Sequence, residues 1–243
     1  TDQFAVFALQ EFDLGGFGLE AAARYERTDV FSVPLSVERG YDAFSGALGI
    51  SNDPDAAFRF GVNVTRAERA PSAEELFSNG PHIATQQFEV GDTDLKTESA
   101  WGVEGYVAGR IGNAQLSFAV YNLWFDDFIY LSGAGAQEDG LPVFEYLQQD
   151  ADWFGLEGDV RVPFLLGNGL EATAELGGDY IEARLDDGEA IPRIPPASLF
   201  GALELDRGAI GGRVEVRHTF APGELAPFET PTDAFTMVDA ALT

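Results

Sequence analysis

Residues 66–101 read RAERAPSAEELFSNGPHIATQQFEVGDTDLKTESAW, and this stretch decides between two kinds of fold. It contains Pro71 and Pro81 and lacks the alternation of apolar and polar residues found on both sides of it. A connection of roughly 30 residues is unusual in a compact domain, where most connections have about 4–6 residues. The stretch is therefore either a small helical domain or a functional loop carried by a rigid β scaffold.

The segments around this stretch alternate between apolar and polar residues. In FRFGVNVT (58–65), the apolar residues Phe58, Phe60, Val62 and Val64 occupy every second position. A period of two is the signal of a β-strand, because successive side chains point to opposite faces. Similar alternation recurs near residues 17–26, 156–164, 170–176 and 210–217. The sequence predicts an all-β fold of about eleven strands, each of roughly 9–15 residues, which is longer than usual.

The connections between the predicted strands are alternately short and long. Short turns with Gly or Asn fall near residues 14–16, 52–56, 112–114, 165–169 and 206–208. Longer polar stretches fall near residues 32–41, 68–97, 132–141, 186–197 and 221–233. Short periplasmic turns and long extracellular loops are typical of a transmembrane antiparallel β-barrel of the outer membrane. Residues 66–101 are therefore predicted to form an extracellular loop, with one helical turn at 74–77 that Ser72 caps.

The aromatic residues predict two belts at the membrane interfaces. One belt flanks the short turns and contains Phe12, Phe17, Phe58 and Phe164. The other lies toward the long loops and contains Trp124, Phe125, Phe128, Tyr130, Phe144, Tyr146 and Trp153. Charged residues on the opposite strand face predict a wide lumen, either filled with water or plugged. Single-chain bacterial barrels have an even number of strands, so we expect about half of a barrel of roughly 22 strands, with an unfinished strand at 233–243.

Composition excludes several classes of protein. The chain has 41 acidic and 14 basic residues and a formal charge of −27, which excludes nucleic acid as a partner because no basic face is available. The absence of cysteine excludes disulfides and thiolate metal sites. No apolar run reaches the roughly 18 residues of a membrane-spanning helix. The first residues, TDQFAVFALQEFD, do not resemble a signal peptide.

The order of several short motifs resembles the mid-barrel region of TonB-dependent outer-membrane receptors. The matching elements are Arg69-Ala70-Pro71, Glu74-Glu75-Leu76-Phe77, Gly80-Pro81-His82, Phe88-Glu89-Val90-Gly91, Leu95, Glu98, Ala119-Val120-Tyr121-Asn122, Asp152, Phe154-Gly155-Leu156-Glu157 and Ile191-Pro192-Arg193-Ile194-Pro195-Pro196. No single motif is strict, but their order and spacing cover the chain from about residue 40. The Gly-Pro-His motif is most similar to the branch that takes up metals or metal chelates.

The resemblance implies a bacterial outer-membrane receptor in which an N-terminal plug fills a 22-stranded barrel. Such a receptor contacts outer-membrane lipid and imports a scarce nutrient, driven by the inner-membrane TonB complex that the plug contacts. The nutrient is a metal, a metal chelate or a siderophore-like small molecule, which is cargo rather than a cofactor. Residues 1–243 are then expected to be a partial barrel domain without the plug and the final strand.

An enzymatic function has no support in the sequence. The chain contains no Gly-x-Ser-x-Gly elbow, no phosphate-binding glycine loop and no His-Glu-x-x-His motif. Two other functions stay open at this point, namely a passive porin-like or adhesin-like barrel and a soluble β-sandwich module that binds or hydrolyses carbohydrate.

His82 is the candidate metal-binding residue, because histidine is the commonest metal ligand and carboxylates lie near it in sequence. Glu89 and Asp92 are the candidate ligand-binding residues beside it, and a purely structural loop histidine is the alternative. Asp126 and Asp127 precede an aromatic run, and they either line the lumen mouth and bind ligand or are ordinary polar residues at a strand end. His218, the other histidine, aligns with apolar residues and is predicted to pack in the interfacial belt.

Overall fold

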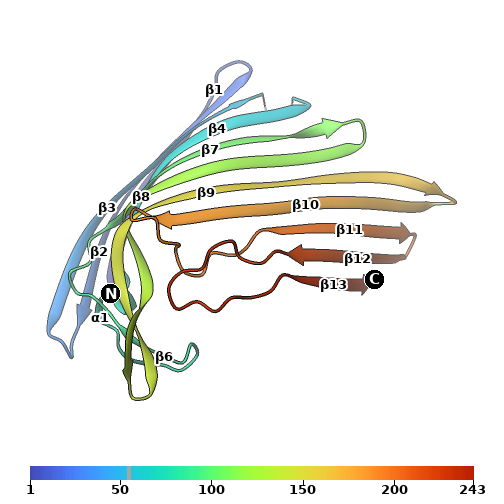
Figure 1. Cartoon of the computed structure of the whole chain (residues 1–243). Helices are drawn as coiled ribbons and strands as arrows, with labels where there is room; N and C mark the ends of the chain where they lie inside the picture. The colour runs from blue at the N-terminus through green and yellow to red at the C-terminus, as the bar shows by residue number, and fades with distance from the viewer. Residues whose placement is uncertain (54–55) are drawn as a thin grey trace.

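The computed structural model describes residues 1–53 and 56–243 as one curved sheet of 13 strands (Figure 1). Eleven of these strands follow one another in chain order across the sheet, and each is antiparallel to its neighbours. The all-β prediction and the count of about eleven strands are therefore confirmed. The remaining two strands, β5 and β6, lie in the connection between β4 and β7.

The strands of the main path are β1 (Asp2–Asp13), β2 (Phe17–Ser32), β3 (Val37–Asn52), β4 (Phe58–Arg69), β7 (Glu98–Ile111), β8 (Ala114–Glu138), β9 (Leu141–Gly167), β10 (Leu170–Leu185), β11 (Ser198–Arg207), β12 (Ile210–Thr219) and β13 (Phe235–Leu242). The connection between β4 and β7 contains α1 (Ala73–Phe77), β5 (Asn79–His82) and β6 (Gln87–Val90). Among the described residues, no helix is long and apolar enough to cross a membrane.

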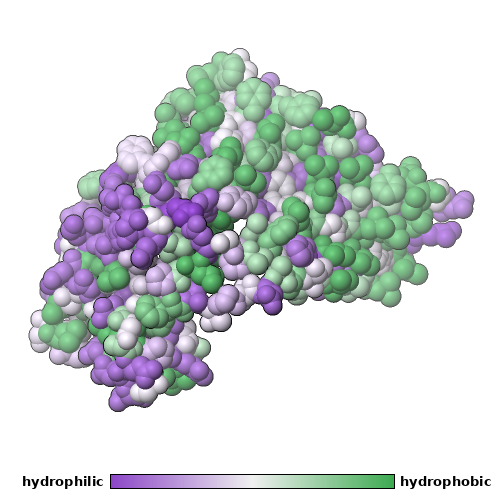
Figure 2. All heavy atoms as spheres, viewed as in Figure 1, coloured by the Kyte–Doolittle hydropathy of each residue, from purple (hydrophilic) through white to green (hydrophobic). Residues whose placement is uncertain are grey.

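One face of the sheet is apolar and exposed. Leu48 pairs with Ala21 on one side and Val64 on the other, and cross-strand partners share a face. The side chains of Leu48 and Leu176 remain 53% and 64% exposed. Such a surface is a liability in water but is the normal outer wall of a barrel in lipid. In Figure 2, hydrophobic side chains gather over the strands on the upper right, and hydrophilic ones gather at the lower left, where α1 and β6 lie.

Aromatic side chains mark both ends of this apolar wall. Phe12, Phe17, Phe58 and Phe164 are exposed beside the tight turns, as predicted. At the other end, Tyr25 contacts Phe44 with ring centroids 5.0 Å apart, and the exposed Trp101 pairs with Trp124. His218 lies at this end too, with its ring edge-on to Phe220 at 4.8 Å, which agrees with the predicted packing role.

Of the seven residues predicted for the belt toward the long loops, six lie elsewhere, and four of these six form a separate cluster. Phe125, Phe128, Tyr130 and Trp153 pack against one another, with ring centroids 5.1 Å apart for Phe125 and Phe128. They cover a buried cluster of small and aliphatic side chains, Ala151, Ala183, Leu185 and Ile191. The register between β8 and β9 shifts between Phe125 and Phe128, where Asp127 has a φ of 55°. This irregularity interrupts the alternation. Counting every second residue along the chain therefore no longer predicts which face of the sheet the following side chains occupy.

Two predicted long loops are strands closed by tight turns. β8 and β9 have 25 and 27 residues and are joined at 139–140, so the predicted loop at 132–141 is wrong. Likewise, β2 and β3 continue to a turn at 33–36, although a loop was predicted at 32–41. Above the membrane neither strand face meets lipid, so the alternation of lipid-facing and lumen-facing residues does not mark these parts of the strands. The ends of β8 and β9 near their shared turn thus project beyond the belt, and Phe144 and Tyr146 lie in this projecting part rather than in the belt.

The opposite connections are short, as predicted, at 14–16, 112–113, 168–169 and 208–209. The turn predicted near 52–56 includes residues 54 and 55, which lie outside the described residues.

Candidate functional site

The connection between β4 and β7 begins with a capped helix. The Ser72 hydroxyl oxygen accepts a hydrogen bond from the Glu75 amide at 3.2 Å, and the Glu75 carboxylate accepts one from the Ser72 amide at 2.7 Å. This reciprocal pair satisfies two of the free amides at the start of a helix. Leu76, which is 1% exposed, anchors α1 to Val30, Tyr41, Leu95 and Ile129. The predicted helical turn with Ser72 as its cap is therefore confirmed.

An arginine ties this helix to the barrel. The Arg69 guanidinium lies 2.9 Å from the carboxylates of both Glu75 in α1 and Glu98 in β7. The Glu98 carboxylate also accepts a hydrogen bond from the Ile129 amide of β8 at 2.8 Å. Because β4, α1, β7 and β8 all meet at these two carboxylates, the start of the connection has a fixed position on the wall.

A hairpin of β5 and β6 follows, and it adds to the projecting part of β9. Phe88 of β6 pairs in parallel with Val143 of β9, and both side chains are buried. Pro81 lies in β5, the outer strand of this added sheet, where its missing amide proton costs no ladder hydrogen bond. The hairpin places the side chains of β5 and β6 on the extracellular part of the molecule.

The hairpin brings His82 and Glu89 together. His82 Nδ1 lies 3.2 Å from Glu89 Oε1 and 2.8 Å from Thr85 Oγ1. The Thr85 hydroxyl donates a hydrogen bond to the His82 carbonyl at 3.3 Å. The Thr85 oxygen therefore accepts the hydrogen bond that it shares with His82 Nδ1. In the neutral imidazole the proton is therefore on Nδ1, and Nε2 carries the free lone pair. This carboxylate–histidine arrangement is typical of histidines that bind metals through the other nitrogen.

Glu89 is held from a second side. Glu89 is only 9% exposed, and its Oε2 accepts a hydrogen bond from the Tyr146 hydroxyl at 3.4 Å. Burial, and then the nearby negative charge of Glu89, raise the pKa of Tyr146. Tyr146 therefore stays protonated as a donor over the ordinary pH range. The sequence did not single out Tyr146 or Thr85 as a site residue. Tyr146 becomes a neighbour of Glu89 through the pairing of β6 with β9, and the turn after β5 brings Thr85 to His82.

The other predicted site residues interact elsewhere. The Asp92 carboxylate accepts from the Asp94 amide at 2.8 Å and closes a local turn. Asp126 accepts from the Ser99 hydroxyl at 3.5 Å, and Asp127 lies 3.5 Å from the ammonium of Lys96. Within residues 1–53 and 56–243, no group of three or more His, Asp or Glu side chains is arranged to hold a metal ion. The structure thus brings His82 and Glu89 together but supplies no complete set of protein ligands.

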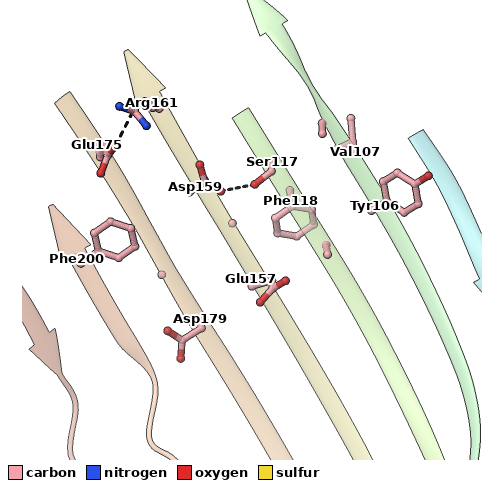
Figure 3. Close-up of a pocket in the computed structure, with 14 residues that line it drawn as sticks. Tyr106, Val107, Ser117, Phe118, Glu157, Asp159, Arg161, Glu175, Asp179 and Phe200 are labelled. Carbon is pink, nitrogen blue, oxygen red and sulfur yellow. Dashed lines mark hydrogen bonds and ion pairs between the residues drawn. The ribbon is translucent and has the colours of Figure 1, made fainter. Parts of the chain in front are cut away.

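The charged face of the wall contains a second feature, a pocket of about 500 Å³ (Figure 3). The Ser117 hydroxyl donates to Asp159, and Arg161 lies 3.3 Å from Glu175. Glu157 and Asp179 also point into this space (Figure 3). By alternation these residues face away from the apolar wall, so in a barrel they line the lumen. The sequence pattern predicted their face but gave no reason to single them out.

The long antiparallel strands, the apolar outer face and the charged inner face are those of part of an outer-membrane barrel. The sequence profile described as "TonB dependent receptor-like, beta-barrel" matches residues 1–243, and the chain belongs to the family of TonB-dependent receptors. Members of this family are transporters of the bacterial outer membrane rather than enzymes, so the chain is part of an outer-membrane protein. The soluble β-sandwich alternative is thereby set aside.

Solved structures agree with this assignment at the level of the fold. The copper transporter OprC covers 99% of this chain with a TM-score of 0.81 and 18% identity. The FrpB iron transporter from Neisseria meningitidis (F3-3 variant) also covers 99%, with a TM-score of 0.69 and 16% identity. The siderophore receptor PirA from Acinetobacter baumannii covers 99%, with a TM-score of 0.68 and 11% identity. The chain spans 39%, 38% and 39% of these three proteins, respectively.

Proposed function

We propose that the whole receptor containing this barrel segment imports a scarce metal, either as the ion or as a chelate, with energy supplied by the TonB complex through an N-terminal plug. The observation that carries the proposal is His82, whose Nδ1 is held by Glu89 and Thr85 while Nε2 keeps a lone pair. Its side chain is 54% exposed, so a ligand from the medium can reach it.

The charge of the chain supports the same ligand class. A formal charge of −27 attracts cations and disfavours anionic ligands that lack compensating contacts. Carboxylates also line the pocket on the charged face, which suits a positively charged cargo during passage (Figure 3). The neighbours OprC and FrpB are described as copper and iron transporters, and this likeness of fold is compatible with a metal cargo.

An uptake experiment tests this function. A strain that lacks the receptor gene is complemented with the wild-type or the His82→Ala receptor and supplied with labelled copper, zinc or iron, free or chelated. We expect wild-type cells to accumulate at least one of these metals and His82→Ala cells to accumulate about tenfold less, in keeping with the loss of one ligand. His218→Ala is the matched control, because His218 contacts Phe220 and Thr236 in the belt.

The same experiment separates active import from a passive barrel. A protonophore, or deletion of TonB, should abolish accumulation in wild-type cells. Accumulation that survives both treatments would support a porin-like function instead. Equal accumulation of every metal by cells with and without the receptor would contradict a metal cargo altogether.

A further inference from the structure

One row of lumen-facing residues crosses six neighbouring strands without a charge. Ala47, at the centre of the row, precedes Leu48 of the apolar wall and therefore points to the opposite face, into the lumen. Each member pairs directly with the next across the sheet, and paired residues share a face. From β1 to β8 the members are Leu9, Ala22, Ala47, Thr65, Gly102 and Leu123.

A second row lies two residues nearer to the extracellular end of the same strands. Its one charged member is Arg24, which is ion-paired with Glu26, and its uncharged members are Phe7, Ser45, Ala67, Ala100 and Phe125. We call the uncharged residues of the two rows the uncharged stripe. Charged residues bound it on both sides, with Glu20 and Glu104 toward the short turns and Glu98 toward the medium.

The uncharged stripe leaves large apolar side chains open to the lumen. Phe7 and Leu9 are 75% and 57% exposed at one end of it. Short side chains such as Ala22 and Ala47 follow, and they leave room for the side chains of an occupant. Apolar surface of this kind marks a contact site rather than a wall in contact with water.

The lumen face of β9–β12 has the opposite character. Arg213 lies 2.6 Å from Glu175 and 2.9 Å from Glu215, and Arg161 lies 3.3 Å from Glu175 (Figure 3). An apolar partner packed here would remove water from these charges, and the loss of their hydration is costly. A hydrated cation, in contrast, keeps its water beside such a wall and is attracted by its carboxylates.

We propose that apolar side chains of the N-terminal plug rest on the uncharged stripe throughout transport, so that the passage for cargo opens along the charged wall of β9–β12. The occupant of the stripe has to be a resident part of the receptor, because a cargo in transit would leave Phe7 and Leu9 in water most of the time. This inference rests on the proposed function, which supplies the plug, and adds which wall the plug keeps and which it leaves.

Photo-crosslinking in the whole receptor tests the inference. Thr65 of the stripe or Thr173 of the charged wall is replaced by p-benzoylphenylalanine, and both positions are half-buried on the lumen face. Cells with and without TonB are irradiated in medium that contains copper, zinc and iron salts, and crosslinked plug peptides are identified by mass spectrometry. From position 65 we expect crosslinks to apolar plug residues in equal yield in both strains. From position 173 the yield should fall at least about twofold in cells with TonB, as expected when half of the receptors have left that wall.

Matched substitutions test the same contact in the purified whole receptor. Thr65→Glu places a carboxylate against the apolar plug surface and should speed hydrogen exchange in the plug by about tenfold. Thr65→Val keeps the shape of the side chain, and Thr173→Glu adds the same charge to the charged wall, so neither should change plug exchange. Unchanged exchange in the barrel strands shows that the barrel is folded. If Thr65→Glu does not assemble, Ala47→Glu, on the neighbouring strand, makes the same test.

The possible outcomes separate this inference from the proposed function. If TonB lowers the yields from positions 65 and 173 equally, the plug leaves both walls, and the inference is overturned while TonB-driven import stands. If only position 173 gives plug crosslinks, the stripe is not the contact surface and the inference also fails. If neither position gives plug crosslinks, the inference is overturned, and the uptake experiment alone decides the proposed function.

Discussion

β8 and β9 each run from the membrane wall into the part of the sheet that projects beyond it, yet different interactions stabilise these two regions. In the wall, β8 and β9 are each paired with a strand on both sides, and apolar side chains face lipid. Above the belt, β7 no longer accompanies β8, and the hairpin of β5 and β6 joins β9 instead. Here neither face meets lipid, and particular side chains such as Leu76 and Arg69 fix the geometry.

This difference explains where the candidate site lies. The outer wall is constrained at every second residue by the need to face lipid, so it offers little freedom for chemistry. The projecting sheet has no such constraint, and its residues are free to bring His82 and Glu89 together. Substitutions in the wall and in the projecting sheet should therefore change the unfolding free energy by different amounts and affect different parts of the chain.

The largest effect is expected from a charge on the lipid-facing wall. Leu48→Arg places a guanidinium midway between the two aromatic ends, and the whole receptor in lipid vesicles should lose about 3 kcal/mol of unfolding free energy in a urea titration. Ile83→Arg is the control, because Ile83 is 86% exposed in the turn between β5 and β6. It should cost about 0.5 kcal/mol or less. Equal losses for the two variants would refute the assignment of the apolar face to lipid.

A smaller and local effect is expected from a cavity under the projecting region. Leu76→Ala removes the 1% exposed side chain that anchors α1 and should destabilise this region by about 2 kcal/mol. Hydrogen exchange should rise across residues 66–101 but stay unchanged in the wall strands, which do not depend on this contact. Exchange that rises throughout the sheet would show that the two regions unfold as one unit.

The smallest effect is expected at the helix cap. Ser72→Ala removes the hydroxyl that accepts from the Glu75 amide, and should cost α1 about 1 kcal/mol. Ser72→Asp keeps an acceptor at this position and should preserve most of the stability. The exchange rates of amides 73–77 measure both changes. Similar rates in the two variants would mean that the cap does not stabilise the helix.

Local patterns in the sequence predict the wall well. Alternation such as Phe58, Phe60 and Val62 follows directly from the two environments of a barrel strand, and Ser72 with Glu75 is a local helix-start signal. Both kinds of signal depend on residues close together in the chain. They therefore need no knowledge of tertiary contacts.

Contacts between distant residues explain what the sequence did not predict. The parallel pairing of Phe88 with Val143, 55 residues later, has no local signal. The same holds for the contact between Phe228, in the connection before β13, and Gly133 of β8. His82 and Glu89 were named as candidates because they are close in sequence, and the hairpin brings them into contact. The same reasoning added Asp92, whereas Asp126 and Asp127 are candidates because they precede an aromatic run. The hydrogen bonds and ion pairs of these three residues lie elsewhere.

The hairpin with His82 is expected to face the medium, while the tight turns face the periplasm. The absence of cysteine from the chain allows a direct measurement with Ile83→Cys and Leu165→Cys in the whole receptor, after any cysteine outside this chain is replaced by serine. Leu165 is 77% exposed beside the turn between β9 and β10. A maleimide on a polyethylene glycol too large to cross the outer membrane should label Ile83→Cys on intact cells and Leu165→Cys only after permeabilisation. The reverse pattern would contradict the account.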